Sequence, residues 1–151
     1  MHRVAVEVIV LRAAPAGGLA YRRQVSALAP DGDPDGAASS LAGGVPAVGL
    51  LHSTSWRRDP AWGLLLTYVA LPDQQDTNGA VPLDRLAVAV GCDARTPSPP
   101  AVTVDEVAAH AIRHLALLRR TDSAVAGALA GHPALDTAIS AADPLPAGQL
   151  T

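Results

Sequence analysis

The chain of 151 residues contains no lysine and no phenylalanine, a single cysteine, and only 3% aromatic residues. Without phenylalanine, its hydrophobic core has to be built mainly from aliphatic side chains. The single cysteine, Cys92, excludes an internal disulfide and a zinc site made of several thiolates, and it fits a reducing cytoplasm. No apolar run approaches the roughly 18–20 residues that span a bilayer. We therefore expect a cytoplasmic protein without a membrane partner.

Basic residues are outnumbered as well, because 11 arginines stand against 14 acidic residues and the net charge is −3. No basic face stands out along the sequence, so nucleic acid is not expected as a partner. With 49% hydrophobic and 17% charged residues, the composition is typical of a globular chain. Its length predicts a single domain over residues 1–151. Glu7 interrupts the first apolar run, which argues against a signal peptide.

The first strand is predicted over residues 3–12, where valines at every second position share one face and Glu7 lies on the other. A turn containing proline and glycine follows, and it predicts a return strand over 19–28. If this turn is centred near positions 16 and 17, Glu7 lies opposite Ser26. The valine face is then predicted to be core and the other face polar.

The strongest local signal is the stretch 49–71, in which two apolar runs flank a short turn. This pattern predicts a β-hairpin. Trp56 and Trp62 flank its turn, and its first arm carries His52 followed by three hydroxyl-bearing residues. A last strand is predicted over 83–90.

The main helix is predicted to begin after Thr103, because Thr103 and Glu106 have the spacing of a capping box. Apolar residues at helical spacing follow, so one face of this helix should pack on the sheet. Two shorter helices are predicted over 123–130 and 133–142, where Gly131 and Asp143-Pro144 provide stop signals.

Residues 29–47 are rich in Gly, Pro, Asp and Ser without periodicity, and they predict a long mobile loop with one helical turn near 37–41. Three alternating aspartates beginning at Asp31 match the opening of a calcium loop, but Ala42 occupies the twelfth position, where such loops need a glutamate. We therefore expect a solvated acidic loop there. The proline-rich segment 96–100 predicts a stiff linker.

His110 and His114 are four residues apart, so they rise on one face of the main helix, at the edge of its apolar stripe. We expect this edge to face the first arm of the hairpin and to bring at least one of the two histidines close to His52 or Thr54. The aromatic residues near the hairpin turn are suited to stacking on a flat ligand. The predicted ligand-binding residues are His52, Thr54, Trp56, Tyr68, His110 and His114.

Two other interpretations of these residues stay open. His52, His110 and His114 form the alternative metal site, because two histidines four apart on a helix and a third from elsewhere are suited to hold a metal ion. The second is a nucleophile among Ser53, Thr54 and Ser55 with His52 or His110 as its base, although the stretch lacks the Gly-x-Ser-x-Gly context of such a residue. No dinucleotide or phosphate-loop motif occurs, so no cofactor is predicted.

The strings HSTSWR and TYVALPD, with DEVAAHAIRHLALL near the C-terminus, resemble a family of small actinobacterial proteins that has no established activity. More distantly, the order of elements is similar to the Nudix fold: a hairpin, a loop, a second hairpin, and a helix over the sheet. Nudix hydrolases hold magnesium with a glutamate-rich helix, whereas this chain has no glutamate between Glu7 and Glu106. The resemblance therefore implies a degenerate Nudix-like architecture without the hydrolase machinery.

We conclude from the sequence that the fold class is α+β, with a mostly antiparallel sheet of about five strands and one main C-terminal helix packed on it. The predicted function is a small-ligand-binding or regulatory domain, without catalysis, for a ligand that the sequence does not identify. One alternative is a hydrolase that uses the histidines, with or without a metal. Another is a homodimer that pairs exposed strands through the hairpin tip.

Overall fold

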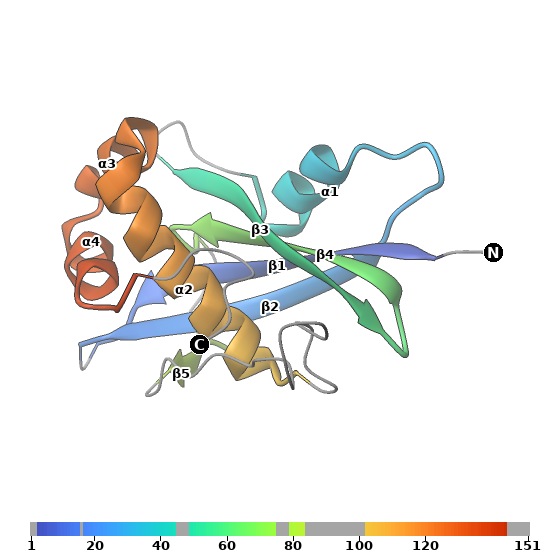
Figure 1. The fold of residues 1–151 in the computed structure, drawn as a ribbon, viewed down its shortest axis with the longest axis horizontal. Coiled ribbons are helices and arrows are strands. Elements are labelled where there is room, and N and C mark those ends of the chain that lie inside the picture. Colours follow the sequence, from blue (N-terminus) through green and yellow to red (C-terminus); the bar gives the residue numbers. More distant parts are fainter. Residues whose placement is uncertain (1–2, 16, 45–48, 75–78, 84–101, 145–151) are drawn as a thin grey trace, which may run out of the picture.

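The computed structural model describes residues 3–15, 17–44, 49–74, 79–83 and 102–144. Within these ranges the chain forms one sheet and several helices, an α+β fold as predicted (Figure 1). The elements, in chain order, are β1 (Val4–Ala13), β2 (Leu19–Ala27), α1 (Pro34–Leu41), β3 (Leu50–Asp59), β4 (Gly63–Leu71), β5 (Val81–Leu83), α2 (Val104–Thr121), α3 (Ser123–Ala130) and α4 (Pro133–Ser140).

The five strands pair in the order β3-β4-β1-β2-β5. Hairpins β1–β2 and β3–β4 are antiparallel, as is the pairing of β2 with β5, whereas β1 and β4 run parallel. The prediction of a mostly antiparallel sheet of about five strands is therefore confirmed. The predicted hairpin over 49–71 is formed by β3 and β4, and its turn spans Pro60 to Trp62.

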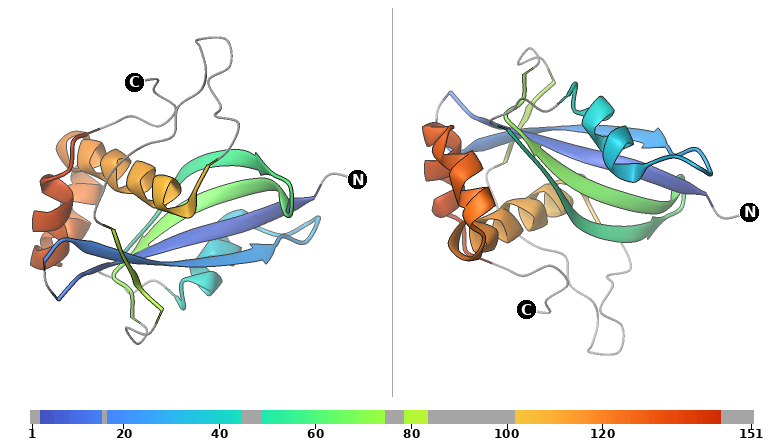
Figure 2. Two further views of the ribbon diagram at one scale, coloured as in Figure 1. Left: turned by 90° about the horizontal axis from the view of Figure 1, so that it is seen from below. Right: turned by 90° about the horizontal axis from the view of Figure 1, so that it is seen from above.

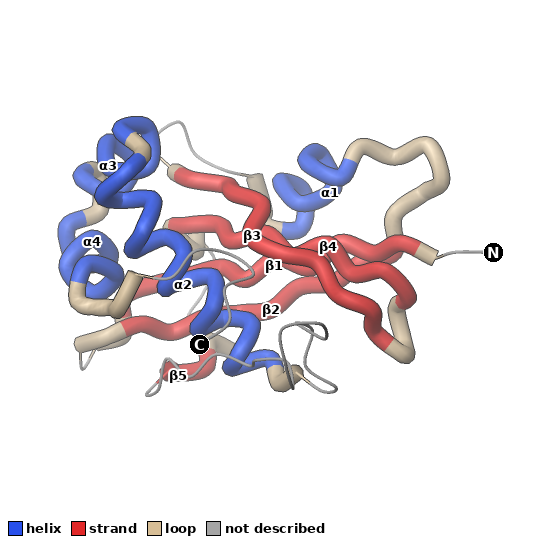
Figure 3. The backbone as a smooth tube through the Cα atoms, in the orientation of Figure 1, coloured by secondary structure: helices blue, strands red, loops and turns tan. Residues whose placement is uncertain are grey.

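Helices cover both faces of this sheet (Figure 2). Helix α1 packs on the face that carries Val6, Val8 and Val10. Helices α2, α3 and α4 pack on the opposite face, over Ile9 and Leu11. In Figure 3 helix α2 crosses the strands, and the turned views of Figure 2 show the sheet between α1 and the other three helices. Strand β1 is consequently buried on both sides, although it carries a charged residue at its centre.

The valine face of β1 is core as predicted, but the prediction that its other face is polar was wrong, because the larger core lies on that Glu7 face, under α2. The register explains part of the difference: Glu7 pairs with Val25, not with Ser26. A shift of one residue exchanges the face on which every side chain of β2 lies. Gly17 and Gly18 close the intervening loop with φ values of 94° and 78°, a left-handed conformation that glycine adopts without strain.

Helix α1 occupies part of the segment 29–47, where the sequence predicted a loop with one helical turn. Asp33 is its N-cap, and its carboxylate accepts hydrogen bonds from the backbone N–H groups of Asp35 (3.3 Å) and Gly36 (3.1 Å). An aspartate of the calcium-like string thus serves to cap a helix. Periodicity did not reveal α1 because the helix is short, begins with proline and contains glycine and small residues.

The capping box at the start of α2 is present as predicted. Thr103 Oγ1 accepts from the backbone N–H of Glu106 at 3.2 Å, and Glu106 Oε1 accepts from the backbone N–H of Thr103 at 3.1 Å. Two otherwise unpaired backbone groups are satisfied in this way. Val102, just before the cap, packs against the same core cluster as Val107.

Replacing Thr103 by alanine should therefore lower the free energy of unfolding by about 1 kcal/mol, the usual cost of losing an N-cap side chain. Urea denaturation measures this change. Thr103→Ser keeps a hydroxyl that can accept the same hydrogen bond, so it should stay close to wild type. Equal losses in both variants would show that the methyl group, and not the cap, carries the effect.

Helices α3 and α4 confirm the two short helices predicted near the C-terminus, and α4 ends at Ser140, two residues earlier than expected. Strand β5 covers only the start of the strand predicted over 83–90. The remainder of that strand and the linker at 96–100 lie outside the described residues. In the parts of the chain that the structure describes, no helix is long and apolar enough to cross a membrane.

Candidate functional site

Three histidines from distant segments meet where α2 packs against β3. The ring centroids of His52 and His114 are 5.5 Å apart with planes inclined by 30°, and those of His110 and His114 are 6.4 Å apart with planes inclined by 4°. His114 therefore stands between the other two in a stack. The prediction that the histidine edge of the helix faces the first arm of the hairpin is confirmed.

Local geometry explains this meeting. His110 and His114 are one helical turn apart, so their rings lie one above the other on α2. His52 pairs with Val69 on β4 and shares its face of the sheet, and Val69 belongs to the core cluster that α2 covers. All three histidines are half-buried. They form a polar edge to an otherwise aliphatic interface.

Burial lowers the pKa of His110, and the electrostatic interactions with His114 and Arg113 lower it further. All three causes disfavour the protonated ring. At neutral pH His110 is therefore a neutral imidazole, which offers one hydrogen-bond donor and one acceptor.

Stability should consequently fall as the solution is acidified. The unfolded chain protonates His110 near its ordinary pKa of 6.5, whereas the folded chain does so only at lower pH. The contribution of this group is complete above pH 6.5 and is lost below it, because the unfolded state then binds more protons. Urea denaturation between about pH 7.5 and about pH 5.5 should give a shallower pH dependence for His110→Gln than for wild type. The same dependence in both proteins would contradict this assignment; His132→Gln is the matched control.

A β-bulge in β3 separates Trp56 from the histidines. The register shifts between Ser53 and Ser55, so Thr54 is the extra residue. Simple alternation would put His52, Thr54 and Trp56 on one face, but after the bulge Trp56 pairs with Leu66 on the α1 face. Trp56 is 66% exposed. Thr54 is buried, and its hydroxyl donates to the backbone carbonyl of Thr67 at 3.2 Å.

Tyr68 also lies on the α1 face, where its hydroxyl donates to Asp35 in the first turn of α1 at 2.5 Å. Burial and the Asp35 carboxylate raise the pKa of Tyr68 to about 12. Tyr21 has the equivalent role on the other face, because its hydroxyl donates to Asp105 in the first turn of α2. Both tyrosines of the chain thus hold a helix to the sheet. Of the six predicted ligand-binding residues, the structure brings together His52, His110 and His114.

Sequence reasoning missed a buried charged cluster centred on Glu7. The Glu7 carboxylate is fully buried and accepts two hydrogen bonds from Arg57, Nη1 to Oε1 at 2.8 Å and Nη2 to Oε2 at 3.1 Å. Arg23 Nε donates to Oε2 at 2.5 Å, and Thr67 Oγ1 donates to Oε1 at 2.7 Å. The available signal was a single glutamate in the middle of an apolar strand, which has to find cationic partners.

The bulge also brings Arg57 into this cluster, because it places Arg57 on the same face of the sheet as Thr67 and Glu7. Burial raises the pKa of Glu7, but the hydrogen bonds from Arg57 and Thr67 and the charge of Arg57 outweigh burial and hold this pKa below its ordinary value of 4.5. Glu7 is therefore ionised at neutral pH. The cluster of two guanidinium groups and one carboxylate has a net charge of +1.

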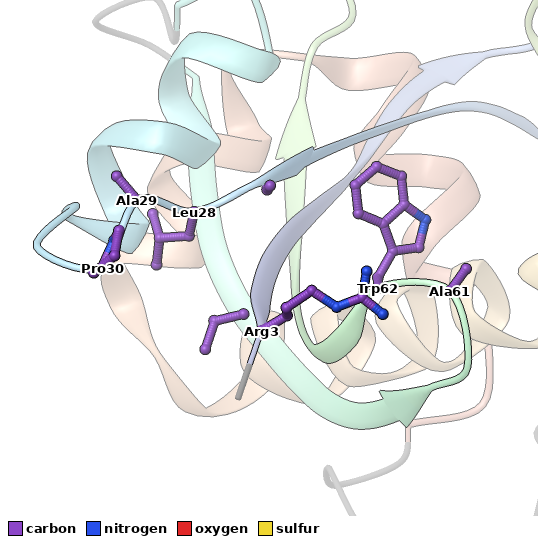
Figure 4. Close-up of a pocket in the computed structure, with 8 residues that line it drawn as sticks. Arg3, Leu28, Ala29, Pro30, Ala61 and Trp62 are labelled. Atoms are coloured by element: carbon purple, nitrogen blue, oxygen red, sulfur yellow. The ribbon is translucent and has the colours of Figure 1, made fainter. Parts of the chain in front are cut away.

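A hollow of about 500 Å³ lies at the other end of the sheet, between the start of β1, the end of β2 and the turn of the β3–β4 hairpin (Figure 4). Arg3 and Trp62 line it together with Leu28 and Pro30. It contains none of the predicted site residues, and its lining is mainly apolar. Arg3 is the one charged side chain among its lining residues. The hollow therefore has fewer polar and titratable groups than the α2 face of the sheet.

Among the residues that the structure describes, no group of three histidine, cysteine, aspartate or glutamate side chains is arranged to hold a metal ion. The histidine rings are stacked instead. The α2 face of the sheet thus combines stacked imidazoles with paired guanidinium groups. Compared with protein-family models, curated proteins and solved structures, the chain shows no match.

Proposed function

We propose that the protein is a small-ligand-binding or regulatory domain without catalytic machinery, and that its site is formed by His52, His110 and His114. The observation that carries this proposal is the meeting of three half-buried imidazoles from β3 and α2. Such rings provide flat faces for stacking and both donors and acceptors for hydrogen bonds. A few polar groups converging beside an apolar core are typical of ligand sites.

Two of the three hydroxyl groups that follow His52, those of Ser53 and Thr54, favour binding over nucleophilic catalysis. Thr54 uses its hydroxyl to hydrogen-bond a backbone carbonyl. Ser53 pairs with Tyr68 and so belongs to the opposite face of the sheet from His52. A serine nucleophile needs a base within hydrogen-bond reach, and Ser53 has no such relation to this histidine.

The proposal includes the Nudix-like architecture. A mixed sheet with helices on both faces agrees with it. The aspartates in the segment between the hairpins do not provide the glutamate-rich helix of a Nudix hydrolase, and one of them caps α1. The glutamates that diphosphate hydrolysis needs are therefore missing from this segment, and the proposed binding role rests on the histidine site rather than on the architecture.

The test is a thermal-shift screen of the full chain against nucleotides, carboxylic acids and divalent metal ions. We expect at least one small molecule to raise the melting temperature of wild type, because a ligand that binds only the native state stabilises it. His52→Ala and His114→Ala should fold but lose this stabilisation. His132→Ala, which removes a histidine at the start of α4, should keep it. Loss of folding in the site variants, with no ligand found for wild type, would favour a purely structural role.

A homodimer is the second candidate, because β3 is an edge strand of the sheet formed by the described residues. Trp56 is largely exposed on this strand, and exposed edges are templates for pairing with another chain. Light scattering of the full chain should then give twice the monomer mass, and Trp56→Arg should return it to monomer. A monomeric mass for wild type would remove this candidate.

A further inference from the structure

The Glu7 cluster presents positive charge outward. Glu7 itself is fully buried, whereas the side chains of Arg23 and Arg57 are 29% and 18% exposed. The arginines approach from β2 and β3, on either side, and cover the carboxylate on the central strand. A molecule that approaches this face therefore meets the guanidinium groups, while the compensating carboxylate lies beneath them.

Arg23 and Arg57 both keep N–H donors that they do not use to bind Glu7. Arg23 uses only Nε toward Glu7, and its two terminal nitrogens make no hydrogen bond to another described residue. Arg57 uses both terminal nitrogens, and its Nε likewise has no hydrogen bond within the described ranges. A guanidinium group has five N–H donors in a planar fork that matches a carboxylate or phosphate. The pair therefore retains capacity for an external anion.

The cluster also lies next to the histidines. His52 pairs with Val69, and Ser55 pairs with Thr67, which in turn pairs with Glu7. These two rows lie on the same face and are two residues apart along β4. At ~3.3 Å per residue, their separation is roughly 7 Å, well within the length of a small metabolite.

We propose that Arg23 and Arg57 are the anion subsite of the ligand-binding site, and that they take a carboxylate or phosphate group of the ligand while the histidines contact its remainder. This inference rests on the proposed function. Glu7 fixes both guanidinium groups before the ligand arrives, so less side-chain freedom is lost on binding. That role accounts for an ion cluster at the centre of a sheet, where an apolar residue would avoid the cost of desolvating charges.

The test is a titration of ¹⁵N-labelled full chain, at constant ionic strength and neutral pH, with inorganic phosphate in one arm and succinate in the other. We expect the Nε–H signals of Arg23 and Arg57 to shift and saturate, and the arm that saturates first identifies the preferred anion. Arg23→Gln should weaken this binding about tenfold or more, the effect of losing a charge-assisted hydrogen bond. Arg23→Lys keeps the charge and can still pair with Glu7, yet it lacks the fork, so it should also weaken binding while remaining folded.

Arg120→Gln, an exposed change in the last turn of α2, is the matched control and should bind as wild type does. If neither anion produces a saturating shift, or if both Arg23 variants bind as tightly as wild type, the anion subsite is wrong. Ligands found in the thermal-shift screen show whether only the anion subsite is wrong or the proposed function is wrong as well. A ligand that is lost in His114→Ala but kept in Arg23→Gln leaves the proposed function standing without the subsite. A ligand that is kept in both variants overturns the two together.

Discussion

Replacing Glu7 by leucine should lower the free energy of unfolding by about 3–5 kcal/mol, the usual cost of removing one partner from a buried ion pair. The variant leaves two guanidinium groups without their shared carboxylate, although each is mostly removed from water. Thr67 loses its acceptor as well, since its hydroxyl donates to Glu7 at 2.7 Å. Urea denaturation at neutral pH measures the loss.

The matched control is the double variant Glu7→Leu/Arg57→Leu. Removing the more buried arginine takes away one unpaired charge, so the double variant should be more stable than Glu7→Leu alone. The pH dependence gives an independent check. Because the folded pKa of Glu7 lies below 4.5, its stabilisation is present above that pH and is lost as pH falls through the folded pKa. A neutral effect of Glu7→Leu would show that the cluster contributes nothing net to stability.

Leu115→Ala should cost about 2–5 kcal/mol, because it leaves a cavity among aliphatic side chains that relax only in part. Leu115 is fully buried in the cluster that joins α2 to the sheet. Because the chain has no phenylalanine, leucine and isoleucine are the largest fully buried apolar side chains in its described part, so losing one of them should have a large effect. Urea denaturation measures this loss, provided that the dependence of the free energy of unfolding on urea concentration is compared with that of wild type.

Leu117 is the matched control for this substitution. It lies two residues further along α2, about 200° around the helix, and it is only half-buried. Leu117→Ala should therefore be much milder than Leu115→Ala. Equal effects at the two positions would mean that the buried face of α2 has been assigned wrongly.

Local patterns predicted the elements well where each pattern depends only on neighbouring residues. The capping box of Thr103 and Glu106 located the start of α2, and the four-residue spacing of His110 and His114 put both rings on one edge of it. The same edge position correctly predicted the approach to His52. Helix α1 was predicted only as one helical turn, because its residues are mostly small and its amphipathic signal is short.

The sequence by itself determined the strands of the two hairpins, the main helix α2 and the shared edge of His110 and His114, because periodicity and capping act over one or two turns. Only the tertiary structure decided which side chains from different strands lie on the same face of the sheet. The register between β1 and β2 put Glu7 beside Val25, and the bulge at Thr54 turned Arg57 toward Glu7 and Trp56 away from His52. Pairing register and bulges depend on contacts between distant strands, and a shift of one residue changes the face of every side chain after it.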